Sequence, residues 1–236
     1  MPSEHLFKTR DALLSALTQE CSVRLTQAIE NKQRASFLVS GGSTPVPLYD
    51  VLSTQVLSWK DVDVALVDER WVSVDSEYSN QCLVKNTLLK NKASSANFIG
   101  MKTDHHRAVD AQAEVEANYR RISSPFDIVL LGLGLDGHTA SLFPEAQMNE
   151  HALSLEGEVL CTAVNAKQSK VTGELTQRMS LSLKAITSAK QIILFITGDD
   201  KLAVYRQALT ADCVIKTPIA AVLQQQCCPV SVYWSP

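Results

Sequence analysis

The sequence has none of the features expected of a protein that crosses a membrane or is secreted. It contains no run of about 18 apolar residues, the minimum length for a transmembrane helix. Met1 to Arg10 include no long apolar stretch of the kind found in signal peptides. The six cysteines form no C-x-x-C pair, and no group of Cys and His has the spacing of zinc ligands. We therefore expect a cytoplasmic protein with reduced, mostly buried thiols and no bound metal.

An excess of charge of either sign is also absent. The 22 Lys and Arg residues nearly balance the 25 Asp and Glu residues, which gives a formal net charge of −3. This balance argues against broad binding to nucleic acids or to membrane surfaces, and we expect neither partner. An anionic small molecule would have to be bound by a local cluster of donors. A monomer and a small homo-oligomer both remain open.

The chain shows no internal repeat, no low-complexity tract and no linker rich in Pro, Gly and Ser. We therefore expect one domain over residues 1–236, with residues 1–34 as an N-terminal helix that packs on it. Within residues 9–31, apolar residues recur at the spacing of an amphipathic helix. They are Leu14, Leu17, Cys21, Leu25 and Ala28.

Short apolar strands alternate with helical segments along the rest of the chain. The expected strands are residues 37–39, 62–67, 126–131, 191–196 and 230–234. The expected helices cover 79–90 and 199–209, and two more begin at Ser43-Thr44-Pro45 and at Thr217-Pro218, each with a capping hydroxyl. This alternation predicts an α/β fold with a mainly parallel, doubly covered, Rossmann-like sheet.

Clusters of glycine and acidic residues follow four of these strands. They begin after Val39, Val67, Leu131 and Ile196. Ligands of open parallel sheets bind beyond the carboxyl ends of the strands. We therefore expect all four segments to meet at one edge of the sheet.

The first segment is Ser40-Gly41-Gly42-Ser43-Thr44-Pro45. Its glycines allow a close backbone approach to an anion, and the helix start that follows presents free N–H groups. Ser43 and Thr44 add hydroxyl donors. The segment lacks the lysine of a P-loop and the G-x-G-x-x-G spacing of a dinucleotide site, so a plain strand-to-helix turn explains it equally well.

The second segment, Asp68-Glu69-Arg70-Trp71-Val72, carries three charges directly after an apolar strand. Taken alone, it is more typical of an exposed loop with a local ion pair. In a site, the forked guanidinium of Arg70 would suit carboxylate or phosphate oxygens.

The third segment runs from Gly132 to Pro144 and has the sequence GLGLDGHTASLFP. Its three glycines permit a tight, open backbone. Asp136 and His138 lie two residues apart in it. Histidine suits a general base because its unperturbed pKa lies nearest neutrality, so this context favours a functional His138 over a structural one.

Two isolated cations complete the candidate set. Arg178 lies in the run Thr176-Gln177-Arg178, and Lys201 falls in the first turn of the helix expected after Gly198. A cation in a first turn opposes the helix dipole, so Lys201 is unfavourable there unless an anion lies nearby. Ordinary surface charge explains both residues equally well.

Together these segments resemble the 6-phosphogluconolactonase family. The matching stretches are SGGSTP at 40–45, DERWV at 68–72 with Ser79-Asn80 downstream, GLGLDGHTASLFP at 132–144, RMSLSL from Arg178, and GDDK at 198–201. The third stretch is shared with a wider superfamily that includes glucosamine-6-phosphate deaminases. Those enzymes carry an aromatic residue where this chain has Arg70, and an Asn-Glu-Pro segment where it has Ser141-Leu142-Phe143-Pro144. The lactonases usually have a proline-containing run before the later arginine, whereas residues 172–177 contain no proline.

The resemblance implies hydrolysis of 6-phospho-D-glucono-1,5-lactone to 6-phosphogluconate, in the oxidative pentose phosphate pathway, without metal or cofactor. It implies that His138 is the general base, that Asp136 orients it, and that Arg70 holds the lactone carbonyl or the product carboxylate. The remaining implied residues would hold the 6-phosphate. They are Gly41, Gly42, Ser43, Thr44, Arg178 and Lys201.

Two other functions compete with this one. A sugar-phosphate deaminase or isomerase on the same fold would release ammonia from glucosamine 6-phosphate. A sugar-phosphate-sensing domain of a transcription regulator would bind such ligands without turnover. Regulators of that kind carry a helix-turn-helix ahead of the sugar domain, whereas only about 35 residues, which are not basic, precede the first expected strand here.

Overall fold

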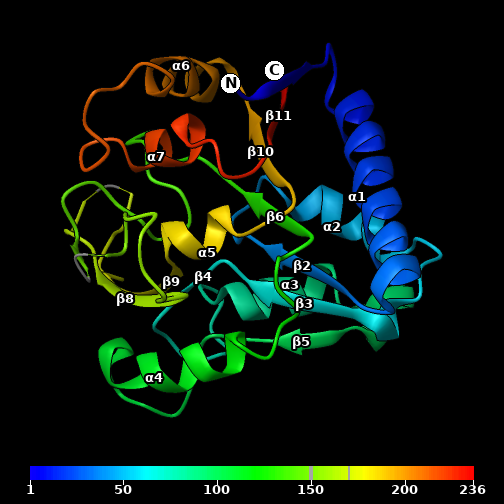
Figure 1. Ribbon diagram of the computed structural model, residues 1–236, viewed down its shortest axis with the longest axis horizontal. Helices are drawn as coiled ribbons and strands as arrows, with labels where there is room; N and C mark the ends of the chain where they lie inside the picture. Colours follow the sequence, from blue (N-terminus) through cyan, green and yellow to red (C-terminus); the bar gives the residue numbers. More distant parts are fainter. Residues whose placement is uncertain (149–150, 170) are drawn as a thin grey trace.

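A seven-stranded, wholly parallel sheet forms the centre of the protein (Figure 1). The computed structural model describes residues 1–148, 151–169 and 171–236. The strand order is β1-β11-β10-β6-β2-β3-β5. The strands are β1 (Ser3–Leu6), β2 (Ala35–Val39), β3 (Val62–Leu66), β5 (Asn97–Ile99), β6 (Ile128–Leu131), β10 (Ile192–Thr197) and β11 (Val230–Ser235). The expected mainly parallel sheet is thus confirmed, and the five expected strands are among its seven.

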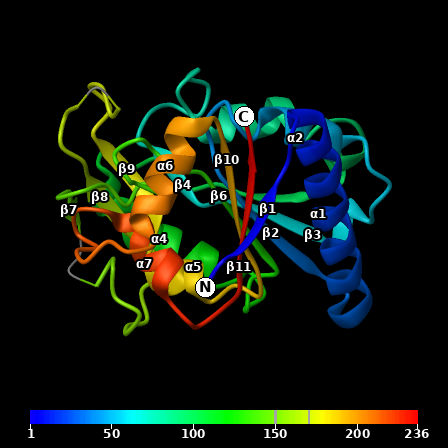
Figure 2. The ribbon, with the colours of Figure 1, turned by 90° about the horizontal axis from the view of Figure 1, so that it is seen from above.

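Helices cover both faces of this sheet. Figure 2 shows α1 and α2 on one side and α6 and α7 on the other. Every residue of β2, β3 and β6 is buried, as a doubly covered parallel sheet requires. The helices are α1 (Arg10–Lys32), α2 (Val46–Ser53), α3 (Asn80–Thr87), α4 (Ala108–Tyr119), α5 (Leu183–Thr187), α6 (Asp199–Ala208) and α7 (Pro218–Gln224), with short 3-10 turns at Trp59–Asp61 and Asn91–Ser95.

A second, antiparallel sheet was not expected from the sequence. Its order is β4-β9-β8-β7. These strands are β4 (Asp68–Arg70), β7 (Gln147–Met148), β8 (Cys161–Asn165) and β9 (Gln177–Leu181). The charged segment after β3 is therefore a strand with two buried carboxylates, Asp68 and Glu69, and not an exposed loop.

The long helix α1 follows its sequence pattern. Leu13, Leu17, Cys21 and Leu25 are fully buried along one face. The hydroxyl of Thr9 accepts a hydrogen bond from the backbone N–H of Ala12 at 3.3 Å, which caps the helix start. Before this helix, β1 pairs with the C-terminal strand β11, so the first residues belong to the main sheet.

Three local expectations were wrong. The helix α2 starts at Val46 after Pro45 and has no side-chain cap, so neither Ser43 nor Thr44 caps it. The hydroxyl of Thr217 likewise makes no capping hydrogen bond to α7. The cysteines are all free thiols, but they are not mostly buried: Cys213 and Cys227 are exposed, whereas Cys21 and Cys161 are buried.

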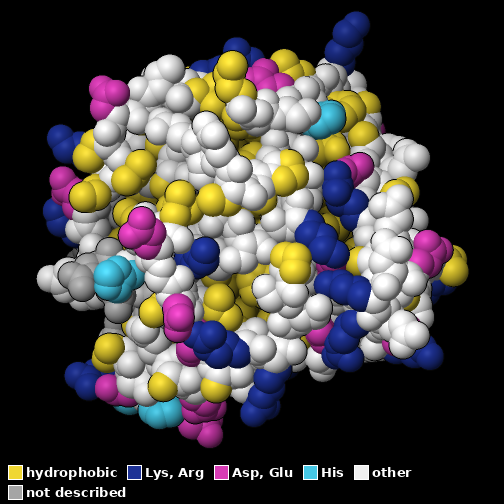
Figure 3. Space-filling model, viewed as in Figure 1, with side chains coloured by type: hydrophobic (Ala, Val, Ile, Leu, Met, Phe, Trp, Pro, Cys, Tyr) yellow, Lys and Arg dark blue, Asp and Glu magenta, His cyan; other side chains and the backbone are white. Residues whose placement is uncertain are grey.

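Ion pairs stabilise the edge of the sheet at which the strands begin. The carboxylate of Asp127 is 3% exposed and lies 2.9 Å from the Lys32 ammonium and 3.0 Å from that of Lys190. It also accepts hydrogen bonds from the backbone N–H and the hydroxyl of Ser36, at 2.8 and 3.2 Å. Figure 3 shows Lys and Arg side chains gathered beside α1 on this face.

We expect Asp127→Asn to lower the free energy of unfolding by about 1–3 kcal/mol, because a buried acceptor of charged donors is replaced by an amide. Urea denaturation measures the change. Asp110→Asn is the matched control, since Asp110 pairs with Arg107 at the exposed start of α4. It should shift the urea midpoint much less. Equal shifts for the two variants would mean that burial does not increase the contribution of Asp127 to the free energy of unfolding.

Candidate active site

A cleft of about 370 Å³ lies at the carboxyl ends of β2, β3, β6 and β10. All four segments that follow these strands contribute to its wall, as expected for an open parallel sheet. Of the sequence-predicted residues, the wall includes Gly41, Gly42, Ser43, Thr44, Arg70, His138, Arg178 and Lys201. Asp136 is absent from the wall but touches His138 from behind.

The loop after β2 is held rigidly below the cleft. The hydroxyl of Ser40 donates to the carbonyl of Leu130 at 2.6 Å, and the Tyr49 hydroxyl donates to the carbonyl of Ser40 at 2.6 Å. Gly42 has a φ of 87°, in the left-handed region that favours glycine. Among the described residues, the hydroxyls of Ser43 and Thr44 have no hydrogen-bond partner, so both can donate to a ligand.

Gly41 is required because the side chain of Asn80 packs against it. A Cβ on Gly41 would lie 1.8 Å from Asn80 Oδ1 and 2.2 Å from its Cγ. Asn80 is the first residue of α3, and its amide donates to the carbonyl of Asp68 at 2.8 Å and to Asp68 Oδ1 at 3.1 Å. This contact joins the loop after β2 to the strand that carries Arg70.

Glu69 joins the backbone of Arg70 to the start of α3. Its buried carboxylate accepts hydrogen bonds from the N–H groups of Arg70, Asn80 and Gln81 and from the Ser79 hydroxyl, at 2.7–2.9 Å. Burial raises the pKa of Glu69, and these hydrogen bonds oppose the rise. The Arg70 guanidinium in turn donates to the carbonyl of Tyr78 at 2.6 Å.

His138 is oriented by Asp136. Its Nδ1 lies 2.5 Å from Asp136 Oδ1, and its backbone N–H donates to the same oxygen at 3.2 Å. Burial acts to raise the pKa of Asp136, but the hydrogen bond and charge of His138 outweigh it and hold the pKa below its usual value. With Nδ1–H donated to Asp136, Nε2 carries the lone pair that a general base needs.

Close packing around the histidine limits its motion. A Cβ on Gly134 would lie 2.0 Å from His138 Nδ1, so glycine is required there. The ring of Phe143 packs against the imidazole with centroids 4.3 Å apart, and the Arg178 guanidinium lies 5.5 Å from the same ring. Phe143 thus lies between the expected base and one of the expected phosphate ligands.

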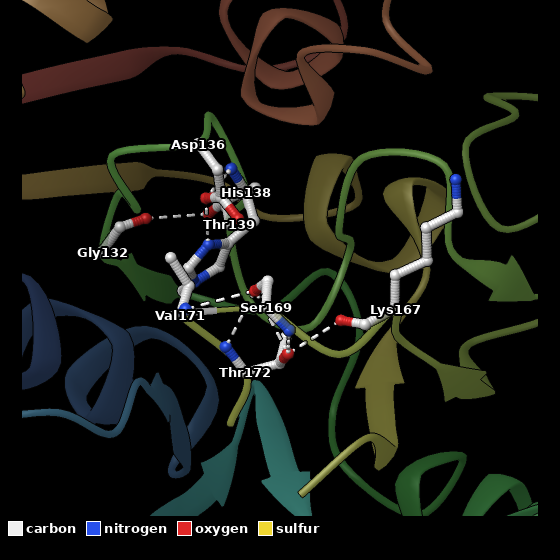
Figure 4. Close-up of polar contacts among 8 residues, drawn as sticks. All are labelled: Gly132, Asp136, His138, Thr139, Lys167, Ser169, Val171 and Thr172. Carbon is white, nitrogen blue, oxygen red and sulfur yellow. Dashed lines mark hydrogen bonds and ion pairs between the residues drawn. The ribbon is translucent and has the colours of Figure 1, made fainter. Parts of the chain in front are cut away.

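A loop that passes beside His138 adds an apolar wall. Figure 4 shows Val171 next to the histidine and the polar contacts that shape the loop. The Thr172 hydroxyl donates to the carbonyl of Lys167 at 2.7 Å, and the N–H of Val171 donates to the Ser169 hydroxyl at 3.1 Å. Val171 lines the cleft and is 47% exposed.

Arg70 and Arg178 lie directly opposite each other on the antiparallel strands β4 and β9. Arg178 is 5% exposed, and its Nε donates to the carbonyl of Leu175 at 2.8 Å. Burial lowers the pKa of Arg178, and the charge of Arg70 lowers it further, against the opposing effect of Asp68. Like charges at opposed positions destabilise a strand pair, so an anion between them is favourable.

Lys201 is a further cation of the cleft, and it is half-buried. It lies in the first turn of α6, beside the exposed pair Asp199 and Asp200. Burial lowers its pKa. None of the ion pairs formed by the described residues includes Lys201, so a bound anion is the partner that would favour its charged form.

The sequence did not single out several residues of the wall. Asp68, Asn80 and Phe143 belong to the quoted motifs, so their place in the sequence was already a signal. Val171 lies in a stretch without any such signal. His105, His106 and His151 are exposed, and they and His5 are absent from the wall.

Within the described ranges, no group of three His, Cys, Asp or Glu side chains is arranged to hold a metal. A metal-free reaction stays a prediction. Within the same ranges, no helix is long and apolar enough to cross a membrane.

Comparisons with known proteins identify the family of the chain. A family model described as glucosamine-6-phosphate isomerases/6-phosphogluconolactonase matches residues 8–234. A 6-phosphogluconolactonase of Rhizobium meliloti is 35% identical over 98% of both chains. One of Mesorhizobium japonicum is 37% identical, over 98% of this chain and 94% of the other.

Solved structures extend the likeness to the whole fold. The crystal structure of a 6-phosphogluconolactonase from Shewanella baltica superposes with a TM-score of 0.93 at 39% identity, covering 100% of this chain and 98% of the other. The resemblance drawn from the motifs is therefore confirmed. The chain belongs to the family of glucosamine-6-phosphate isomerases and 6-phosphogluconolactonases.

Proposed function

We propose that this protein hydrolyses 6-phospho-D-glucono-1,5-lactone to 6-phosphogluconate, the lactonase step of the oxidative pentose phosphate pathway. The observation that carries the proposal is the histidine that Asp136 orients inside a cleft with three cations, Arg70, Arg178 and Lys201. The names of the relatives support the same reaction. The six free thiols are consistent with action in the cytoplasm.

In this mechanism, Nε2 of His138 removes a proton from water as the water oxygen bonds to the lactone carbonyl carbon. Arg70 stabilises the oxyanion that forms. The bond between that carbon and the ring oxygen then breaks, and the ring oxygen takes up the proton from His138. The products are a free hydroxyl and a carboxylic acid, which releases its proton to solvent to give a carboxylate that Arg70 can retain.

The 6-phosphate would lie between the loop after β2 and the cations Arg178 and Lys201. Ser43 and Thr44, directly ahead of α2, line this region, and their hydroxyls are free to donate. Binding the remote phosphate orients the ring against His138. Release of acid from the lactone, with and without the 6-phosphate, tests this function directly.

The deaminase alternative differs at Arg70, where deaminases carry an aromatic residue. Ammonia release from glucosamine 6-phosphate would support it. The sensing alternative needs a separate DNA-binding segment ahead of the sugar domain. That alternative predicts ligand binding without turnover, so acid release from the lactone would contradict it.

We expect His138→Gln to reduce kcat by about 10²–10⁴-fold, because the water then lacks its base. Acid release measures the loss after subtraction of spontaneous hydrolysis, and circular dichroism checks the fold. Asp136→Asn should lower kcat less, since the imidazole stays but its orientation is weakened. A folded His138→Gln variant with near-normal kcat would rule out the general-base role.

We expect Lys201→Ala to raise KM for the phosphorylated lactone more than it lowers kcat, as for binding shared by ground and transition states. A charge-assisted contact of about 1.5–3 kcal/mol corresponds to about one to two decades in affinity. Unphosphorylated gluconolactone is the control and should lose far less. Equal losses in kcat/KM for the two lactones would show that Lys201 does not bind the phosphate.

The same contact has a predictable pH dependence. Because burial lowers the pKa of Lys201, its charge is lost at a lower pH than that of an ordinary lysine. The Kd for 6-phosphogluconate should therefore rise on the alkaline side in the wild type. Lys201→Arg should hold the affinity constant over that range, because arginine stays charged.

We expect Gly41→Ala to lower both kcat/KM and the melting temperature, because its Cβ would displace the Asn80 side chain from Asp68. Asn80→Ala should cause a comparable loss on its own. The double variant should lose little more than either single variant, since the clash and the lost contact are the same event. Additive losses would contradict this account.

A further inference from the structure

Phe143 contacts two functional side chains of the cleft at once. Its ring packs against the imidazole of His138, with the centroids 4.3 Å apart and the planes inclined by 30°. The guanidinium carbon of Arg178 lies 5.5 Å from the centre of the same ring, within the range of a cation–π interaction. Phe143 is 4% exposed and lines the cleft. The proposed reaction assigns no step to this ring, although the ring contacts both the general base and a phosphate ligand.

The segment that carries Phe143 is anchored to the strand that carries Arg178. The backbone N–H of Ser141 donates at 3.2 Å to the hydroxyl of Ser180, which lies two residues beyond Arg178 on β9. Ala140 has a φ of 49°, in the left-handed region that a residue with a side chain rarely adopts. The surrounding contacts must hold such a turn in its strained shape. The backbone that carries the ring is therefore fixed relative to Arg178.

Asp136 fixes only one end of the His138 imidazole. The contact joins Asp136 Oδ1 to Nδ1 of the histidine at 2.5 Å (Figure 4). One contact at one ring atom leaves the plane of the imidazole undetermined, and the last side-chain torsion of histidine has broad energy minima. Packing must therefore set this plane. The ring of Phe143 lies against the imidazole and supplies that packing, so it helps to set the direction in which Nε2 points.

Arg178 lies beside the same ring with most of its donors unused. Of the five N–H groups of its guanidinium, the described residues accept one, the Nε–H, which donates to the carbonyl of Leu175 at 2.8 Å. Two oxygens of a bound phosphate can accept hydrogen bonds from the remaining N–H groups and so fix the plane of the guanidinium. Because that plane lies beside the ring of Phe143, a phosphate that fixes it also restricts the ring.

We propose that Phe143 is a positioning residue that links Arg178 to His138: phosphate bound at Arg178 restricts the ring, and the ring holds the imidazole in the orientation that activates water. The inference rests on the proposed lactonase function. The role is indirect, because a phenyl ring exchanges no proton. An effect on the orientation of the base appears in kcat, whereas a contact that only binds the phosphate appears in KM.

The test is a double-mutant cycle between Phe143 and Arg178, read from kcat as acid release at saturating 6-phosphogluconolactone. We expect Phe143→Leu to lower kcat about 10-fold and to change KM less than about twofold, because the base is misplaced while the phosphate contacts remain. Arg178→Met should lower kcat and also raise KM. In the Arg178→Met background, Phe143→Leu should lower kcat less than about threefold, because the link is already broken.

Lys201→Ala provides the matched background, because Lys201 lines the same cleft but is not among the ring contacts of Phe143 in the described chain. There Phe143→Leu should lower kcat by the full factor. Phe126→Leu controls for the loss of a buried ring, since Phe126 is buried and is absent from the cleft wall. It should lower the melting temperature and leave kcat unchanged. Equal losses from Phe143→Leu in all backgrounds would overturn the link to the phosphate, and an unchanged kcat in the folded variant would overturn the positioning role.

A second measurement needs no substitution at Phe143 and decides the matter if Phe143→Leu does not fold. NMR relaxation of the labelled His138 imidazole is recorded with and without inorganic phosphate, in the wild type and in Arg178→Met. Phosphate should order the imidazole in the wild type only. No change in the wild type, or the same change in both proteins, would overturn the link. A wild type that does not hydrolyse 6-phosphogluconolactone refutes the lactonase function instead, and the NMR comparison still tests the link.

Discussion

The parallel pairing of β10, β6, β2 and β3 is the constraint on which the site depends. Because neighbouring parallel strands point the same way, their carboxyl ends meet at one edge, and the four segments that follow them surround one cleft. Parallel strands need crossover connections, which cover both faces with helices and bury the strands completely. Most residues of these strands are therefore apolar, and the polar residues of the cleft lie beyond the strand ends, where a ligand can satisfy them.

The antiparallel sheet adds a second arginine to the cleft. It brings Arg178, more than a hundred residues further along the chain, directly opposite Arg70. Two cations at opposed positions repel each other, and burial of Arg178 adds a desolvation cost. The negative charges of Asp68 and Glu69 partly offset this cost, because both raise the pKa of Arg178. In the free protein the cations of the cleft repel each other, and a bound anion would reduce this repulsion.

The sequence predicted those helices and strands whose apolar pattern lies within a single segment of the chain. The apolar face of α1 and the runs that form β2, β6 and β10 could be read directly, as could the Asp136–His138 pair between glycines. The antiparallel sheet could not, because its short, partly polar strands are defined by partners far away in the chain. For the same reason Asp68 and Glu69 matched an exposed loop: the donors that allow their burial are Ser141 and the start of α3. The helix expected at Ser43 starts later, because Pro45 occupies the cap position.

The buried cations of the cleft are unfavourable in the absence of a ligand. Burial lowers the pKa of Lys201 and of Arg178, so the folded protein disfavours the charged form of both. A bound phosphate would instead raise the pKa of both residues, because a nearby anion favours the charged form of a cation. The charge of Asp68 already acts on Arg178 in the same direction as a bound anion would, because it raises the pKa of that residue.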